Sequence, residues 1–432
     1  MLLQFTVKNY KVFGDEIKLS MIASADKTTR EQENIISLPQ FGLRVLKSAV
    51  IYGANASGKS KLIDAMKFVE KFILTSAETQ SSREIDTVPF LLTTTTENAP
   101  SLFEIVFILD NEMYRYGFEV TKEKIVSEWL FHRPKTKEKQ LFYRQEQEFE
   151  IHNSFKVSDL IEKKRIKTNT LLLSKADMEN DPLATKIILF VRKQIYILSG
   201  LNEGGYMGFT ISELKKENKK KEILNLLKSA DIGIEDVEPS LLNIEDLPLK
   251  MSLQLKKMII KLADEDLEDK DSDIISGVYT FHNKFDENKN IIDFVRFSME
   301  EDESMGTQKY FALLGPILNT LSEGKTLFID ELDAKLHPNL VYKILEIFNS
   351  KTGNPNNAQL IFNTHNTNFL NRSIFRRDQI WFVEKNRYGS ANLYSLSDIK
   401  GVRKDDTFEE KYTEGRYGAI PYLADFDKML NL

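Results

Sequence analysis

Apolar and polar positions alternate with a period of two at the start of the chain. Leu2–Val7 and Glu16–Met21 follow this pattern and predict two short strands. Ser48–Tyr52 is a short apolar run, and apolar residues then recur at helical spacing over Lys59–Leu74. We therefore predict a strand that leads into a helix through the glycine-containing loop between them.

The pattern between residues 101 and 151 is typical of an antiparallel sheet. Alternating runs are separated by turn-length segments, as in strands connected by hairpins. This part of the chain therefore predicts an antiparallel β-subdomain. The predicted strands are Leu102–Leu109, Tyr114–Val120, Ile125–Phe131 and Gln140–Arg144.

Residues 156–273 are mostly of helical pattern and heavily charged. They include the basic run Lys215–Lys221 and the acidic segment Asp264–Asp273. Such runs are usually solvated helix faces or loops. The basic run is nevertheless the best candidate in the chain for contact with a phosphate backbone.

The last third of the chain alternates between strand and helix, as a parallel sheet with crossover helices does. Its predicted helix is Ser304–Leu321. The predicted strands are Ile274–His282, Ile291–Ser298, Thr326–Ile329, Gln359–Asn363 and Gln379–Glu384.

Composition indicates an ordinary globular protein, with 41% hydrophobic and 29% charged residues among 432. The chain has no cysteine, which excludes disulfides, thiol catalysis and cysteine zinc sites. No signal peptide and no run of 18 apolar residues is visible, so we expect a soluble, cytoplasmic protein without membrane contact. The net charge of −6 argues against indiscriminate coating of nucleic acid.

Residues 53–60, Gly-Ala-Asn-Ala-Ser-Gly-Lys-Ser, match the whole phosphate-loop pattern and lie between a predicted strand and helix. The backbone N–H groups and the helix N-terminus would face a phosphate. Lys59 would reach the β- and γ-phosphates of ATP, and the Ser60 hydroxyl would ligate Mg²⁺. A plain glycine-rich turn is the alternative, which the full match disfavours. The nucleotide-binding residues predicted here are Gly53, Asn55, Ser57, Gly58, Lys59 and Ser60.

Thr326–Glu331 is an apolar strand that ends in two carboxylates. Asp330 would hold Mg²⁺ through its water shell, and Glu331 would polarise the attacking water as a general base. A strand end that meets solvent is the simpler interpretation of such a sequence. The phosphate loop in the same chain favours ATP hydrolysis instead.

A Ser-x-Gly sequence, Ser304 and Gly306, precedes the predicted helix of the last third. A serine hydroxyl and free N–H groups at a helix start form an anion site. Far from its own phosphate loop, this site makes sense if it caps the γ-phosphate of ATP held by another subunit. A simple serine N-cap is the alternative.

His365 follows the predicted strand Gln359–Asn363. Ligands of open α/β sheets bind at the carboxyl ends of strands, so His365 would reach the γ-phosphate and join Lys59 and Glu331 as a catalytic residue. A structural histidine is the alternative. The order of phosphate loop, Ser-Gly helix, Asp-Glu pair and histidine favours the functional interpretation.

These four motifs resemble those of the ABC-type ATPase heads of the SMC, RecF and OLD class. More narrowly, the chain resembles the AAA-type ATPases of bacterial abortive-infection and phage-defence systems, of the AbiL or RloA type. The resemblance covers roughly residues 1–130 and 275–425. Supporting sequences are Asn-Tyr-Lys-Val-Phe at 9–13, the segment Asp330–Pro338 and the closing segment Gly415–Pro421.

The resemblance implies an α/β fold: an ABC-type P-loop ATPase head with a mixed β-sheet and flanking helices. An antiparallel β-subdomain and an inserted helical domain would complete it. Residues 1–155 would form the N-terminal half of the head, 156–273 the charged helical insertion, and 274–432 the C-terminal half.

The resemblance also implies a role for individual residues and partners. Lys11 or Phe13 would contact the adenine, and Asp333 would couple two sites across a dimer. ATP and Mg²⁺ would be the ligands of a homodimer or larger homo-oligomer. The implied function is a sensor or regulator that controls a separately encoded effector, a nuclease or toxin. The alternative is a RecF- or SMC-like DNA-maintenance ATPase that clamps DNA.

Overall fold

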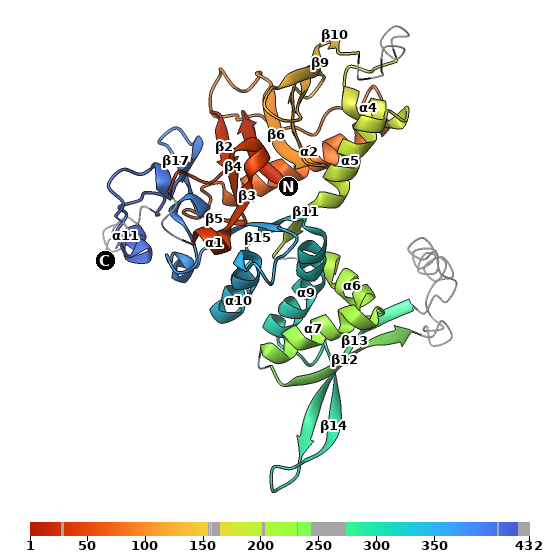
Figure 1. Cartoon of the computed structure of the whole chain (residues 1–432), viewed down its shortest axis with the longest axis vertical. Helices are drawn as coiled ribbons and strands as arrows, with labels where there is room; N and C mark the ends of the chain where they lie inside the picture. Colours follow the sequence, from red (N-terminus) through yellow and green to blue (C-terminus); the bar gives the residue numbers. More distant parts are fainter. Residues whose placement is uncertain are drawn as a thin grey trace, which may run out of the picture. The chain divides into compact units, whose positions relative to one another are not determined.

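The computed structural model describes residues 1–26, 30–153, 155, 157, 165–200, 204–230, 232–242, 274–403 and 406–421 (Figure 1). These residues belong to two compact units. The first comprises Met1–Leu201, Thr320–Ala334 and Val341–Leu432, and the second comprises Asn202–Asn319 and Lys335–Leu340.

The first unit contains a seven-stranded sheet in the order β10-β9-β8-β7-β6-β1-β2, in which all neighbours are antiparallel. The two predicted N-terminal strands thus join the predicted β-subdomain in one sheet, which confirms that subdomain. The strands are β1 (Leu2–Lys8), β2 (Ile17–Ser20), β6 (Ser101–Leu109), β7 (Glu112–Val120), β8 (Ile125–Arg133), β9 (Lys139–Gln145) and β10 (Glu148–Ile151).

The second sheet of this unit has the order β11-β15-β16-β5-β17-β18. Its first five strands run parallel, and β18 pairs antiparallel with β17. Every residue of β5 and β16 is buried, as their unbroken apolar character predicts. The strands are β5 (Ser48–Tyr52), β11 (Ile195–Ser199), β15 (Thr326–Asp330), β16 (Gln359–Asn363), β17 (Ile380–Lys385) and β18 (Ala391–Ser395).

Helix α2 (Lys59–Thr75) packs against both sheets. Phe68 lies 4.9 Å from Phe103 of β6, and Phe72 lies 5.5 Å from Phe118 of β7, between ring centroids. The helix also contacts β11 and β15. Packing on two sides holds the N-terminus of α2 beside the carboxyl end of β5. Further elements of this unit are α1 (Glu31–Asn34), β3 (Ile35–Leu38), β4 (Leu43–Leu46), α4 (Leu172–Met178), α5 (Pro182–Gln194), α10 (Pro338–Asn349, from Val341) and α11 (Phe408–Thr413).

The second unit is organised around helix α9 (Met305–Glu323), most of which belongs to it. Pro316 lacks the N–H that would bond the Ala312 carbonyl, and the Thr210 hydroxyl of α6 donates to that carbonyl instead, at 2.5 Å. A Cβ on Gly315 would lie 2.5 Å from the Thr210 hydroxyl oxygen, so glycine permits this close crossing. The other elements are α6 (Gly204–Glu213), α7 (Glu217–Ser229), β12 (Ile234–Leu242), β13 (Ile274–Phe285) and β14 (Ile291–Ser298).

The two units divide the chain differently from the three segments expected from the sequence. The expected helical insertion, 156–273, contributes α4, α5 and β11 to the first unit and α6, α7 and β12 to the second. The apolar residues of α5 are followed directly by those of β11. The sequence pattern therefore does not separate the two elements, and the short parallel strand at the sheet edge was not predicted. The acidic segment Asp264–Asp273 lies outside the described residues.

Candidate active site

The phosphate loop follows β5 and has a backbone that requires glycine at two positions. Gly53 and Gly58 have φ values of 156° and 124°. A Cβ on Gly53 would lie 2.4 Å from the Val383 carbonyl oxygen, and one on Gly58 would lie 2.9 Å from Val12 Cγ2. The loop is therefore pressed against β17 on one side and against the N-terminal segment on another.

The phosphate loop places donor groups at the start of α2. The N-cap residue of this helix, Gly58, supplies no side-chain cap, and the Ser57 hydroxyl is buried without a hydrogen-bond partner among the described residues. Asn55 is exposed in the loop, and Ser60 is half-buried in the first helical turn. Uncapped N–H groups and an unsatisfied buried hydroxyl fit the oxygens of a phosphate.

The Lys59 side chain is folded back into its own loop. It is 5% exposed, and its Nζ donates to the carbonyl oxygens of Gly53 (2.8 Å) and Ala54 (3.1 Å). Burial lowers the Lys59 pKa to about 8, while Glu331 and Asp330 oppose that shift. The negative charge of a bound phosphate would therefore stabilise this buried ammonium, whose hydrogen bonds go to neutral carbonyl oxygens.

The Asp330–Glu331 pair is held by Asn363, the last residue of the neighbouring strand β16. Asn363 is fully buried, and its side-chain amide donates to Asp330 Oδ1 at 2.5 Å. Its amide oxygen accepts from the Glu331 backbone N–H at 2.6 Å. Glu331 has a φ of 56°, a left-handed conformation that is uncommon for this residue type. Asn363 therefore fixes both the carboxylate of Asp330 and the turn that carries Glu331.

The sequence analysis did not assign a function to Asn363. Its signal was present, because it is the one polar side chain at the buried end of an apolar strand, two residues before His365. Gly200, after β11, was also missed. Its N–H donates to the Asp330 carbonyl at 2.6 Å, and a Cβ there would lie 2.1 Å from the Glu331 carbonyl oxygen.

His365 lies just beyond the carboxyl end of β16, where the neighbouring strand β5 enters the phosphate loop. Its side chain is exposed. The surrounding protein and the charge of Lys59 lower the His365 pKa, while Glu331 and Asp333 oppose this. A largely neutral imidazole at physiological pH follows. The neighbouring strands β15, β16 and β5 are parallel, so Glu331, His365 and the phosphate loop lie at the same edge of the sheet.

The segment 9–13 contacts the phosphate loop through a residue that the sequence analysis did not select. Val12 lies against Gly58, and its carbonyl accepts from the Ala391 N–H at 2.8 Å. Lys11 pairs with Asp64 of α2 at 2.7 Å. Phe13 is fully buried in the hydrophobic core. The expectation that Phe13 contacts adenine does not fit this burial, because a ring without exposed surface cannot stack on a base.

The second unit carries Ser304 and Gly306 at the start of α9. The Ser304 hydroxyl accepts from the Thr307 N–H at 3.1 Å, which is an N-cap contact. Ser304 is nevertheless exposed, and the adjacent Met305 is 64% exposed. The two interpretations of this motif are therefore compatible, since a capping hydroxyl at an exposed helix start is still accessible to an anion.

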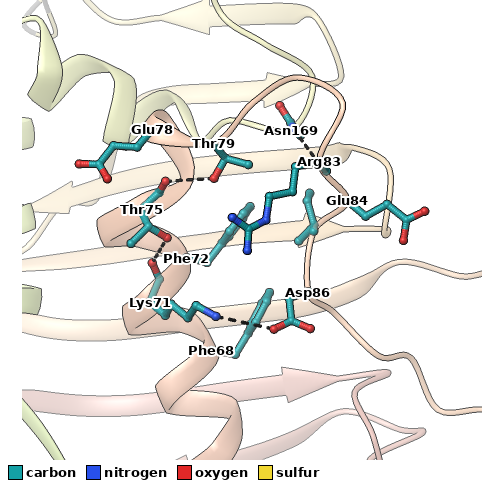
Figure 2. A pocket seen from close by; sticks show the side chains of 11 residues that line it. Phe68, Lys71, Phe72, Thr75, Glu78, Thr79, Arg83, Glu84, Asp86 and Asn169 are labelled. Atoms are coloured by element: carbon teal, nitrogen blue, oxygen red, sulfur yellow. Dashed lines mark hydrogen bonds and ion pairs between the residues drawn. The ribbon is translucent and has the colours of Figure 1, made fainter. Parts of the chain in front are cut away.

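A cavity of about 360 Å³ opens beside the far half of α2 (Figure 2). Phe68 and Phe72 line it, together with Arg83 and the ion pair of Lys71 and Asp86 at 3.7 Å. Lys71 is twelve residues beyond Lys59, which is about 18 Å along a helix. This cavity is therefore separate from the phosphate loop.

Comparison with known proteins identifies the family. The profile of the family described as "AAA domain, putative AbiEii toxin, Type IV TA system" matches residues 48–371, well over half of the chain. The chain belongs to this family. The match spans the phosphate loop, the Asp330–Glu331 pair and His365, so the AAA domain includes the residues brought together here. No curated protein matches the chain.

Solved structures similar to this AAA-domain protein have low sequence identity. The SMC head domain from Thermotoga maritima is 13% identical, with 91% of this chain and 98% of that chain covered and a TM-score of 0.39. An Smc head bound to the C-winged helix domain of ScpA is 14% identical, with 91% of this chain and 97% of that chain covered and a TM-score of 0.44. CbiO1 from Clostridium perfringens, part of the ABC transporter complex CbiONQ, is 10% identical, with 90% of this chain and 95% of that chain covered and a TM-score of 0.27.

All three TM-scores lie below 0.5, so the fold assignment rests on features of this chain. These are the parallel sheet with its phosphate loop and the attached antiparallel sheet. They confirm the expected class, a mixed α/β P-loop fold with an antiparallel β-subdomain. Within the described ranges, no helix combines the length and apolar character needed to cross a bilayer.

Proposed function

We propose that this chain binds and hydrolyses ATP as one half of a two-site dimer, and that the ATP-bound dimer controls a separately encoded effector in bacterial phage defence. The observation that carries the proposal is the clamp of Asn363 on Asp330 and Glu331, close to Lys59 and His365. A strand end that merely met solvent would need no such buried bidentate contact.

The phosphate loop would bind the triphosphate of ATP. Phosphate oxygens would accept hydrogen bonds from the uncapped N–H groups of α2, from the Ser57 hydroxyl and from the Lys59 ammonium. Ser60 and Asp330 offer hard oxygen donors that fit Mg²⁺, which would neutralise phosphate charge when bound. Val12, against Gly58, and Lys11 are the residues of segment 9–13 available near the nucleotide.

Glu331 would act as the general base. Its carboxylate would orient a water molecule whose oxygen attacks the γ-phosphorus, and the bond from that phosphorus to the β–γ bridging oxygen would break. The water proton passes to the carboxylate, and ADP and phosphate leave. His365 would donate a hydrogen bond to the γ-phosphate and thus respond to its departure.

Ser304 and Gly306 of a second copy would complete the γ-phosphate site. The exposure of Ser304 at the start of α9 supports this assignment, because such a helix terminus offers N–H groups and a hydroxyl to an anion. Asp333 would couple the two sites, since its charge already acts on Lys59 and His365.

The description of the family supports a role in defence, because it names a toxin and a toxin–antitoxin system. The DNA-clamping alternative has less support from the described residues. In the basic run 215–221, Lys216, Lys219, Lys220 and Lys221 each pair with a carboxylate of this chain. The run is therefore largely neutralised within its own unit.

The Glu331→Gln variant tests the proposal. Its amide cannot accept the water proton, so we expect normal ATP binding, hydrolysis slowed by about a hundredfold or more, and an ATP-dependent dimer in size-exclusion chromatography. Hydrolysis at the normal rate would remove the base assignment. Affinity purification from the host with Glu331→Gln as bait and Lys59→Ala as the control would then separate the two functions. An ATP-dependent nuclease or toxin supports defence, and DNA-repair proteins support the alternative.

A further inference from the structure

A second cavity of the first unit, of about 490 Å³, is formed near the carboxyl end of the described chain. Four of its lining residues are cationic, namely Lys400, Arg403, Lys411 and Arg416, and one, Asp406, is a carboxylate. The cavity lining thus has a surplus of positive charge, although the whole chain has a net charge of −6. We call this cavity, defined by these residues and Tyr417, the basic cavity.

The cations of the basic cavity differ in how they are paired. Arg416 Nε lies 2.7 Å from Glu414 Oε2, and Lys411 Nζ lies 3.6 Å from the same oxygen. Within the described part of the chain, the side chains of Lys400 and Arg403 form no ion pair. Asp406 does not neutralise them directly, since its Oδ2 accepts the backbone N–H of Arg403 at 2.9 Å. Two exposed cations at the cavity are therefore available to an anion.

Tyr417 also lines the cavity, but its hydroxyl does not reach the cavity surface. The residue is 5% exposed, and the hydroxyl is buried without a hydrogen-bond partner among the described residues. Burial raises the Tyr417 pKa to about 12, with Asp406 adding to this effect and Arg416 opposing it. The groups of the cavity that can meet an anion are therefore its cations.

We propose that the basic cavity binds a small molecule that carries phosphate groups, with Lys400 and Arg403 as the charged contacts. Guanidinium and ammonium groups are the usual partners of phosphate oxygens. The volume lies in the range of small-molecule sites. A nucleic-acid duplex fits less well, since it requires a longer row of exposed cations.

Nothing in the proposed ATPase assigns this site. The residues that line the cavity, 399–403, 406, 411, 416 and 417, follow β18, whereas the phosphate loop lies between β5 and α2. The cavity beside α2 differs from the basic cavity in the charge of its lining. There, Lys71 already pairs with Asp86, and two further carboxylates, Glu78 and Glu84, line the wall (Figure 2). That cavity gives an anion no comparable advantage.

The test uses inorganic pyrophosphate as the probe and isothermal titration calorimetry as the measurement. The full chain with Lys59→Ala serves as the background, because this change removes binding at the phosphate loop. We expect saturable binding of one pyrophosphate per chain. Adding Lys400→Glu and Arg403→Glu should weaken it by about tenfold or more, as expected for the loss of charged contacts.

A matched pair of substitutions controls for general electrostatics. Lys385→Glu and Arg387→Glu change the same two residue types on exposed positions at the β17–β18 turn, outside the cavity. Binding should stay within about twofold of the background protein. Equal weakening by both pairs, or no saturable pyrophosphate binding, would overturn the proposal. So would a DNA duplex that binds through Lys400 and Arg403 when pyrophosphate does not.

Discussion

At the scale of single residues, the site depends on groups whose hydrogen bonds are arranged for a ligand or for each other. Lys59 bonds to its own loop, while Asn363 holds Asp330 and the Glu331 backbone. The motif residues could be predicted from the sequence because their spacing is fixed by phosphate chemistry. Asn363 and Gly200 could not, because their contacts join segments far apart in the chain.

The Lys59 pKa of about 8 predicts a proton uptake on ATP binding. Burial penalises the ammonium, so the free protein loses this proton as the pH rises through about 8, whereas bound phosphate restores it. Uptake should be about 0.9 proton per site at pH 9 and about 0.1 at pH 7, from simple titration. Calorimetry in two buffers with different ionisation enthalpies measures this. His365 does not contribute at pH 9, since its pKa is already below its usual value. A pH-independent uptake would contradict the assignment of Lys59.

Asn363→Ala should impair both stability and catalysis. It removes two buried hydrogen bonds and costs about 1–3 kcal/mol in the free energy of unfolding, measured by urea denaturation. It should also lower kcat strongly, because Asp330 and Glu331 lose their support. Asn354→Ala is the matched control, since Asn354 is equally buried and bonds the backbone of Phe348 and Ala358 away from the site. If the control lost as much kcat at equal stability, Asn363 would be only structural.

At the scale of elements, segments with a clear apolar pattern were predicted well, and two edge strands were missed. β5, β16 and α2 agree with their predicted bounds to within one residue. Lys47 and Gly53 interrupt the pattern at the ends of β5, and Gly58 does so before α2. β11 was missed because it continues the apolar pattern of α5. β12 was missed because Pro239 and the charged residues of this segment are not typical of a strand. In the structure it pairs with β13 along its length.

The close approach of β11 to the Asp330–Glu331 turn gives an element-scale prediction. In Gly200→Ala, the new Cβ would lie 2.1 Å from the Glu331 carbonyl oxygen, so the backbone must shift. We expect a loss of about 1–3 kcal/mol in stability and a reduced ATPase rate. Gly208→Ala in helix α6 is the control, because no atom lies within 4 Å of its added Cβ. Thermal melting and steady-state ATPase assays of both proteins test this. A Gly200→Ala protein as active as Gly208→Ala would show that the contact does not position Glu331.

At the scale of the whole molecule, the sequence predicted the fold class but not how the chain divides. Four motifs and a β-rich segment were enough to expect a P-loop fold with an antiparallel β-subdomain. The two compact units, with α9 and α10 continuing from one into the other, depend on long-range packing that no local pattern encodes. The Ser304 motif and the phosphate loop belong to different units. The proposed composite site joins the phosphate loop of one copy of the chain to the Ser304 motif of another.

Complementation between two inactive variants shows whether the ATP site is shared between two copies of the chain. Lys59→Ala and Ser304→Arg each disable a different half of the proposed site, and the two proteins are mixed before ATP is added. A mixed dimer has one site with both defects and one intact site, so we expect about a quarter of the wild-type ATPase rate from freely exchanging, independent sites. Lys59→Ala mixed with Glu331→Gln is the control, since both defects lie in the same half and no site is restored. A rate for the first mixture that stays at the sum of its two inactive components would contradict the account.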